Sequence, residues 1–264
     1  MRADHRARLL RTERYGPGLY SSTFHSPDLA RTARPGQFVM LEVPGRVRPY
    51  LRRAYSVADA RPDSGEVEFL VKTIGVGTAA LEELPEGAPA RLLGPLGNAF
   101  STAALPSGGR VAIVAGGIGA APFPLLYRAL AASRVAGDFF LGGRSAADLA
   151  FRRRFDAIVT GETVVATDDG SLGEKGFVTE AFRGRAAQTR YARVFACGPM
   201  PMFRSLARVV EPLALDAEFS TEADMGCGFG VCLGCVLPGA EKPFLVSCTE
   251  GPILAPGKIA WDRT

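Results

Sequence analysis

The spacing of four cysteines close to the end of the chain restricts the possible folds more than any other feature. Cys227, Cys232, Cys235 and Cys248 follow the pattern C-x4-C-x2-C-x12-C. This is the spacing of plant-type [2Fe–2S] proteins, in which one loop supplies three thiolates and a distant segment supplies the fourth. The pattern therefore predicts a metal-dependent tail that carries a [2Fe–2S] cluster.

Four glycines surround these cysteines, at positions 226, 228, 230 and 234. A cluster held by four thiolates carries negative charge, which backbone N–H groups stabilise when they approach the sulfurs closely, as glycine permits. A structural zinc site usually shows two C-x2-C pairs, whereas Cys232 and Cys235 form a single pair. The spacing favours the cluster over zinc or unliganded thiols. Cys197 stands apart after an expected strand, and we exclude it from the cluster.

Composition and charge exclude several classes of protein. The chain has 264 residues, 47% of them hydrophobic, which is enough for one or two buried cores. The net charge of +4 is spread without a strong basic stripe, so we expect neither nucleic acid nor a membrane surface as a partner. We find no apolar run of about 18 residues, and we expect no membrane insertion.

The cellular compartment follows from the first residues and from the cysteines. Charged residues continue from Arg2 to Arg14 without the apolar core of a signal peptide, so we expect a cytoplasmic protein. Clustered thiols in a reducing compartment point to metal or redox chemistry rather than to disulfides. The two histidines, His5 and His25, lie far from the other candidate residues, which disfavours a His-based triad or a His-rich zinc centre. We assign no residue as a general acid or base.

Hydrophobic periodicity divides the chain into three parts. Short alternating runs such as 37–43 and 67–72 predict antiparallel strands and a small β-barrel over residues 1–102. Between residues 103 and 219 strands alternate with helices, which predicts a parallel sheet covered on both faces. The expected strands are 111–115, 139–141, 163–166 and 194–196, and the expected helices are 122–132, 146–155, 177–182 and 202–210. Residues 220–264 form the cysteine-rich tail. The fold class is therefore α/β plus all-β.

Two motifs in the first part suit a flavin. Arg53-Ala54-Tyr55-Ser56 offers an arginine for a phosphate, an aromatic ring for the isoalloxazine and a hydroxyl for its polar edge. Taken alone, such a stretch can simply be a strand. Gly75-Val76-Gly77-Thr78 precedes an expected helix at 79–84, and a glycine-rich turn that opens a helix presents N–H groups to a pyrophosphate. Two phosphate-seeking elements favour a dinucleotide flavin, FAD, over FMN.

A third motif suits a nucleotide. The turn from Gly116 to Pro122 joins a strand to a helix, where a pyrophosphate can bind at the helix N-terminus. Cys197-Gly198 ends the fourth strand at the carboxyl edge of the sheet, on the side where ligands bind in such folds. The motif departs from the full dinucleotide fingerprint, because strand two is followed by Arg144 rather than by an acidic residue. A tight βα connection without a ligand is the alternative.

These motifs together resemble the ferredoxin–NADP reductase superfamily, which joins a flavin barrel with R-x-Y-S to a nucleotide domain with G-G-x-G and C-G-P. The tail narrows the resemblance. The stretches Met225–Cys235 and Cys248–Pro252 are similar to the electron-transfer subunits of class 1B dihydroorotate dehydrogenases. The resemblance covers nearly the whole chain, with the motifs in the same order.

The resemblance implies an oxidoreductase subunit of pyrimidine biosynthesis. A partner catalytic subunit oxidises dihydroorotate on its own FMN, and electrons pass through a [2Fe–2S] cluster and FAD to NAD as the exchangeable acceptor. It also implies a heterotetramer with two copies of each chain. The residues that it assigns to FAD are Arg53, Ala54, Tyr55, Ser56, Leu70, Val71, Lys72, Gly77 and Thr78. It places Gly117, Gly119, Cys197 and Gly198 near the nicotinamide nucleotide, and the four tail cysteines on the cluster.

Two departures leave alternatives open. The family commonly has Arg-Pro-aliphatic-Ser where this chain has Arg-Ala-Tyr-Ser, and Arg144 leaves NADP possible as acceptor. A related iron–sulfur reductase subunit, of the sulfhydrogenase or NADH-dependent ferredoxin:NADP oxidoreductase type, is the second hypothesis. A non-enzymatic scaffold with a zinc-bound tail is the third. Because a cluster at the end of a reductase relays electrons outward, we expect Cys227–Cys248 to lie near a subunit interface.

Overall fold

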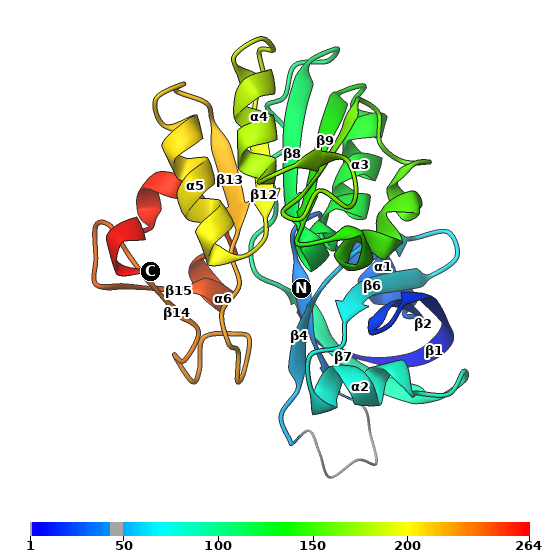
Figure 1. The fold of residues 1–264 in the computed structure, drawn as a ribbon. Coiled ribbons are helices and arrows are strands. Elements are labelled where there is room, and N and C mark those ends of the chain that lie inside the picture. Colours follow the sequence, from blue (N-terminus) through cyan, green and yellow to red (C-terminus); the bar gives the residue numbers. More distant parts are fainter. Residues whose placement is uncertain (1, 43–49) are drawn as a thin grey trace.

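The computed structural model describes residues 2–42 and 50–264. They form an antiparallel sheet, a mostly parallel sheet stacked above it, and a C-terminal tail that lies alongside both (Figure 1). The predicted strand 37–43 is observed at 38–42, and Val43 lies outside the described residues.

The first sheet is an antiparallel half-barrel. Its strands lie in the order β4-β3-β7-β1-β2-β6-β5 among the described residues. The strands and helices of this part are β1 (Ala3–Gly16), β2 (Leu19–His25), α1 (Pro27–Thr32), β3 (Phe38–Glu42), β4 (Arg53–Ser56), β5 (Asp59–Arg61), β6 (Glu66–Lys72), α2 (Val76–Glu82) and β7 (Pro89–Leu96). Apolar side chains fill its interior, among them Tyr20, Phe24, Val39 and Phe69, none of which is exposed to solvent.

The second sheet has the order β11-β10-β9-β8-β12-β13-β16 in the described part of the chain, and its neighbours are parallel except for β13 and β16. Its strands are β8 (Arg110–Gly116), β9 (Ala136–Gly143), β10 (Thr163–Thr167), β11 (Glu174–Lys175), β12 (Val194–Cys197), β13 (Ala217–Ser220) and β16 (Ile253–Leu254). Its helices are α3 (Phe123–Ala132), α4 (Val178–Ala186) and α5 (Met200–Val210), with the 3₁₀ helices η1 (Gly117–Ala120) and η2 (Ala146–Phe155).

Helices cover both faces of this sheet, because alternate residues of a buried strand point to opposite sides. Val111 and Ile113 of β8 pack in one apolar cluster with residues of α3. Ala112 and Val114 of the same strand pack in another cluster with residues of α4 and α5. Figure 1 shows α3 on one side of the sheet and α4 and α5 on the other. The predicted fold class, with its two-sided parallel sheet, is therefore confirmed.

The helix expected at 79–84 is observed at Val76–Glu82, so residues 76–78 form its first turn instead of a loop before it. Two other segments also differ from the sequence-based expectation. Residues 146–155 form a 3₁₀ helix with non-helical dihedral angles at Leu149, rather than a regular α-helix. Leu149, Phe151 and Phe155 are all buried, and this spacing does not fit one face of a 3.6-residue helix. The second difference is β13, a short strand that the periodicity did not reveal and that carries the chain into the tail.

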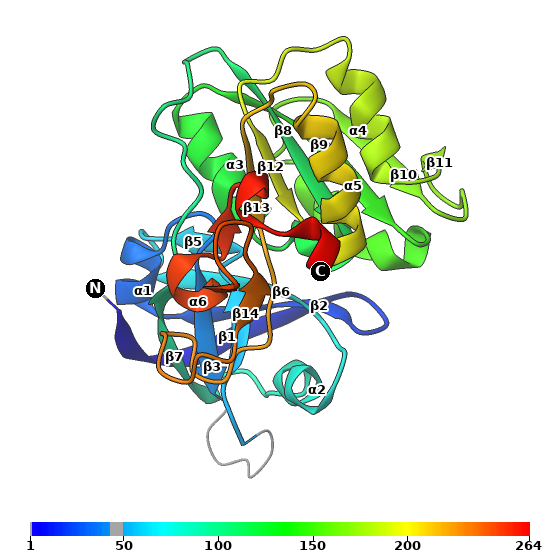
Figure 2. The ribbon, with the colours of Figure 1, turned by 90° about the vertical axis from the view of Figure 1, so that its left-hand side faces the viewer.

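The tail spans both sheets. It contains β14 (Val236–Pro238) and β15 (Phe244–Val246), which pair as a hairpin, followed by α6 (Ser247–Glu250), β16, and the 3₁₀ helices η3 (Pro256–Lys258) and η4 (Trp261–Arg263). The Asn98 side-chain amide, which follows β7, donates to the Ile253 carbonyl at 2.7 Å and accepts from the Ile253 N–H at 2.9 Å. In Figure 2 the tail runs across the front of the half-barrel, over β3 and β7.

Ion pairs fasten the two sheets together. Arg128 of α3 donates to Asp59 of β5 at 2.8 Å. Arg154 of η2 donates to Glu68 of β6, and both of these side chains are largely buried. Within residues 2–42 and 50–264, no helix is long and apolar enough to cross a membrane.

The pair between Glu68 and Arg154 provides a test of this packing. We expect Glu68→Ala to lower the free energy of unfolding by about 3–5 kcal/mol, because it leaves the buried guanidinium without its partner. Asp28→Ala is the matched control. It breaks an exposed pair with Arg31 on α1 and should cost less than about 1 kcal/mol. Urea unfolding of both variants measures the difference, and equal costs would contradict a structural role for the buried pair.

Candidate functional site

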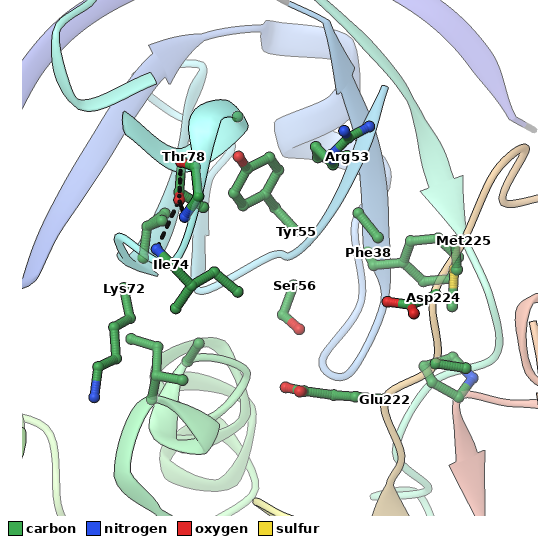
Figure 3. Close-up of a pocket in the computed structure, with 18 of the residues that line it drawn as sticks. Phe38, Arg53, Tyr55, Ser56, Lys72, Ile74, Thr78, Glu222, Asp224 and Met225 are labelled. Atoms are coloured by element: carbon green, nitrogen blue, oxygen red, sulfur yellow. Dashed lines mark hydrogen bonds between the residues drawn. The ribbon is translucent and has the colours of Figure 1, made fainter. Parts of the chain in front are cut away.

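A cleft of about 1030 Å³ lies where the half-barrel, the parallel sheet and the tail meet (Figure 3). Strand β4, the end of β6 and the start of α2 form one wall, and the segment Ser220–Gly226 forms another. Its full lining is Phe38, Leu51, Arg53, Ala54, Tyr55, Ser56, Leu70, Val71, Lys72, Ile74, Gly75, Val76, Gly77, Thr78, Ile118, Ala121, Ser220, Thr221, Glu222, Ala223, Asp224, Met225, Gly226 and Pro252. All nine residues that the sequence assigns to FAD are among them.

Strand β4 presents three different groups to the cleft. Burial raises the pKa of Tyr55 to about 12, so its hydroxyl stays protonated at neutral pH and can donate a hydrogen bond. The Arg53 guanidinium donates to the backbone carbonyls of Leu51 and Arg52, at 2.8 and 3.3 Å. No carboxylate among the described residues pairs with Arg53, so its charge is available to an anionic ligand. Ser56 follows at the inner end of the strand (Figure 3).

Hydrogen bonds of the Thr78 side chain fix the backbone at the start of α2. The Thr78 hydroxyl oxygen accepts from the N–H groups of Ile74 and Gly75, at 2.9 and 3.1 Å, and donates to the Gly75 carbonyl. The first intrahelical bond runs from the Ala79 N–H to Gly75. The N–H groups of Val76, Gly77 and Thr78, the first three residues of α2, therefore lack a helical acceptor, as at every helix start. All three residues line the cleft.

The cleft fits a flavin dinucleotide in size and chemistry. Ligand pockets measure about 300–1,000 Å³ and are mostly apolar with a few polar groups. Ile74, Val76 and Leu51 line the cleft and are 84%, 66% and 51% exposed. Large apolar side chains left exposed together mark a surface that a ligand covers. Arg53 and the turn at Gly77 add the positive charge and N–H donors that phosphates require.

Lys72 and Arg144 share one carboxylate. Lys72 donates to Asp148 Oδ1 at 2.7 Å, and Arg144 donates through Nε to Asp148 Oδ2 at 2.8 Å. The Arg144 guanidinium, with Lys72 beside it, holds the pKa of Asp148 well below its usual range. Lys72 thus lines the cleft from β6 while it also ties the half-barrel to η2.

The residues assigned to the nicotinamide nucleotide gather at the carboxyl ends of β8 and β12. These strands lie side by side although β9 follows β8 in the chain, so the strand order reverses between them, and ligands bind at such points. A Cβ atom added at Gly119 would overlap the Cys197 carbonyl, which explains glycine at this close approach. Gly117, Gly119, Cys197 and Gly198 do not line the cleft themselves, but Ile118 and Ala121 of the same turn do.

Glu222 was not anticipated from the sequence. It lies between β13 and the first tail cysteine, where its side chain is exposed to the open cleft. Desolvation by the cleft walls raises the pKa of its carboxyl above the usual range. Figure 3 shows Glu222 and Ser56 pointing toward each other from opposite walls. Burial, and next the charge of Glu222, raises the pKa of the Cys197 thiol. The only signal in the sequence was that few residues separate β13 from Cys227. A segment this short that joins the parallel sheet to the cysteines must pass along the cleft.

The four tail cysteines lie in two pairs. The Cys232 N–H donates to the Cys227 sulfur at 3.4 Å, and the Cys248 N–H donates to the Cys235 sulfur at 3.4 Å. Cys235 and Cys248 are buried against Phe38, Met40 and Leu96 of the half-barrel. Cys232 is exposed, and Cys197 is buried apart on β12. No three His, Cys, Asp or Glu side chains in the described ranges are grouped as ligands of a single metal ion.

The environment of Cys227 and the loop that follows it suits a thiolate ligand of a cluster. Burial raises the pKa of Cys227, but N–H groups, chiefly those of Cys232 and Phe229, outweigh it and lower the pKa to about 6. Gly228 has a φ of +81°, and a Cβ atom there would lie 2.5 Å from Met40 Cγ. Glycine is therefore needed where this loop touches the half-barrel. Two thiol pairs suit two irons with two thiolates each, as in a plant-type cluster.

The fold and the site define a flavin-dependent oxidoreductase of the ferredoxin reductase type. Three family models match the chain: an oxidoreductase FAD-binding domain over residues 20–100, an oxidoreductase NAD-binding domain over 113–208, and the iron–sulfur cluster binding domain of dihydroorotate dehydrogenase B over 222–259. The predicted cofactor classes, a flavin, an iron–sulfur cluster and NAD, are confirmed at this level.

Two curated relatives carry the same description, "Dihydroorotate dehydrogenase B (NAD(+)), electron transfer subunit". The protein from Desulforamulus reducens is 34% identical over 97% of this chain and 98% of its own length. The protein from Bacillus caldolyticus is 36% identical over 91% and 92%. The chain therefore belongs to the family of dihydroorotate dehydrogenase B electron transfer subunits.

Solved structures agree on the fold. A chain of the NADH-dependent reduced ferredoxin-NADP oxidoreductase is 26% identical, with a TM-score of 0.85 over 97% of this chain and 90% of its own. The ferredoxin NADP⁺ reductase of Neisseria gonorrhoeae, solved with bound FAD and NADP, is 19% identical, with a TM-score of 0.63 over 78% of this chain and 90% of its own. The second likeness shows the fold alone.

The arrangement of the thiols predicts that the tail cysteines bind iron and that Cys197 does not. We expect Cys235→Ser to lose most of the iron and acid-labile sulfide, because one iron would lack a thiolate. Cys197→Ser, the matched control on β12, should keep the parent content. Iron and sulfide assays on purified variants measure this, and full iron in the Cys235 variant would contradict the ligand assignment.

The cleft predicts the role of Arg53. We expect Arg53→Ala to weaken FAD binding about 10- to 100-fold, because a hydrogen bond to a charged group is worth about 1.5–3 kcal/mol. Titration of flavin-free protein with FAD measures the affinity. Arg31→Ala, on α1 and outside the cleft lining, is the control, and similar affinities in the two variants would contradict a phosphate contact at Arg53.

Proposed function

We propose that this chain couples the oxidation of dihydroorotate by a partner subunit to the reduction of NAD⁺, with FAD in the cleft and a [2Fe–2S] cluster on Cys227, Cys232, Cys235 and Cys248. When bound, the cluster carries single electrons, the flavin handles one or two, and NAD⁺ accepts a hydride. The described residues act by binding these groups and by holding them close together.

One observation carries the proposal. The segment that bears the cysteines is also a wall of the flavin cleft. Met225 and Gly226 line the cleft, and the next residue is Cys227. Cys235 and Cys248 pack against Phe38, which lines the cleft from β3. This shared wall supports a direct passage of electrons between the two sites.

The remaining site residues have roles that follow from their positions. Arg53 and the turn at Gly77 bind phosphates, Tyr55 and Ser56 meet the ring system, and β6 supports it. Gly119 and Cys197 shape the place where the nicotinamide approaches. Glu222 lines the cleft, and desolvation there raises the pKa of its carboxyl, so it can hold the proton that an oxidised flavin takes up when it gains two single electrons.

NAD, rather than NADP, is the acceptor that we propose. Arg144 is already paired with Asp148. Asp168 and Asp169 follow β10 directly beside it, and the Asp169 N–H donates to the Arg144 carbonyl at 3.2 Å. Hydrogen bonds from Ser171 lower the pKa of Asp169, so it is ionised at neutral pH. Two carboxylates at this edge of the sheet would repel a 2′-phosphate.

The partner subunit that we propose is the FMN-containing dihydroorotate dehydrogenase catalytic chain, in a heterotetramer of two copies of each. Apolar side chains around the cysteine loop support a docking surface, among them Val231, Leu233 and Phe244, which are 73%, 60% and 61% exposed. We also propose three units at 1–102, 103–219 and 220–264. The five free thiols support a reducing compartment such as the cytoplasm.

Mixing experiments test the function. Without oxygen, NADH should bleach the FAD of the purified chain, whereas dihydroorotate should do so only after the dihydroorotate-oxidising subunit is added. Absorbance of the flavin band follows both reactions. If NADH reduces the flavin and dihydroorotate fails to do so in the complex, the partner is a different one. A colourless protein with stoichiometric zinc would contradict the whole proposal.

A further inference from the structure

Ser247 lies opposite Cys235 across the hairpin of the tail. The hairpin pairs Val236 with Val246, so the next pair is Cys235 with Ser247. The Ser247 N–H donates to the Cys235 carbonyl at 2.8 Å, which continues this register. Ser247 is also the first residue of α6, so this hydrogen bond ties the start of the helix to the residue before β14.

Both residues are buried. Cys235 is 1% exposed and Ser247 is 0% exposed, whereas Val236, which follows Cys235 in the chain, is 44% exposed. Cys248 follows Ser247 directly, and its N–H donates to the Cys235 sulfur at 3.4 Å. Ser247 is thus next to one cysteine in the chain and opposite the other across the hairpin.

The Ser247 hydroxyl has no partner. Its oxygen is buried and makes no hydrogen bond with any of the described residues. The backbone of Ser247 is satisfied, since its N–H reaches Cys235 and its carbonyl accepts from the Gly251 N–H at 3.1 Å. A buried hydroxyl without a partner costs about 1–3 kcal/mol, and such a group calls for a ligand or ion that completes it.

Sulfur is the acceptor that this position offers. The thiolates and sulfides of an iron–sulfur cluster carry negative charge and accept hydrogen bonds, which help to set the reduction potential. We propose that the Ser247 hydroxyl donates a hydrogen bond to a sulfur of the cluster held by Cys235 and Cys248 and thereby raises its potential. The inference rests on the proposed function only in that a cluster binds at these cysteines.

The direction of the change in reduction potential follows from the charge of the cluster. Reduction adds one electron to the cluster, so its sulfurs become more negative and the hydrogen bond becomes stronger in the reduced form. Removal of the donor therefore disfavours reduction. Ser247 is a positioning residue in this sense, because it exchanges neither electrons nor protons with substrate.

The test compares potentials of the holoprotein in a redox titration followed by electron paramagnetic resonance. We expect Ser247→Ala to keep its iron and to lower the equilibrium constant for reduction about tenfold, which is about 59 mV more negative for a one-electron couple. Ser22→Ala is the matched control. The Ser22 hydroxyl in β2 is also buried and unpaired among the described residues, but it lies in the half-barrel, so its removal should leave the potential unchanged.

Two further variants guard against a packing effect. Ser247→Thr and Ser247→Val have similar shapes and differ in the hydroxyl, so the threonine variant should keep the parent potential and the valine variant should shift it. An unchanged or more positive potential in the alanine variant overturns the inference, as does loss of the cluster from all three variants. A parent chain that binds no iron or sulfide contradicts the proposed function instead, so the two failures are distinguishable.

Discussion

The packing of the tail against the half-barrel is the contact on which the rest of the site depends. Cys235 and Cys248 lie against Phe38, Met40 and Leu96, and Asn98 clamps Ile253 with two hydrogen bonds. These contacts bring a segment of little intrinsic regularity onto two strands of the first sheet. Without them the cysteines would belong to a separate appendage, and the cleft would lose the wall formed by residues 220–226.

This arrangement places the three proposed binding sites in one continuous series. The turns proposed for the nucleotide lie at the carboxyl ends of β8 and β12, the cleft proposed for FAD lies below them, and the thiol pairs lie on the other side of the shared wall. The strand β13 makes the series possible, because it leaves the parallel sheet next to β12 and leads straight into Glu222 and Cys227. A chain of this topology can pass electrons between a nucleotide and a cluster within one subunit.

The sequence was most informative where a pattern is local. The cysteine spacing, the apolar run of β8 and the Arg53–Ser56 stretch each predict structure from neighbouring residues, and the two-sheet fold was confirmed. Features that depend on contacts between segments far apart in the chain could not be predicted from the sequence. The partnership of Arg144 with Asp148 and Lys72, the position of Glu222 opposite Ser56, and the register that sets Ser247 against Cys235 all arise from how separate elements meet. The helix at 146–155 was predicted, but its 3₁₀ geometry and the kink at Leu149 were not, because its buried residues follow no single helical stripe.

The central claim is that one wall serves both the flavin and a two-iron cluster. The most direct measurement is an anomalous difference map, recorded at the iron absorption edge from crystals of the complete holoprotein. The account predicts two adjacent iron peaks, one beside the Cys227 and Cys232 pair and one beside the Cys235 and Cys248 pair, with flavin density in the cleft that Met225 lines. A single metal peak, or iron away from these thiols, would contradict it.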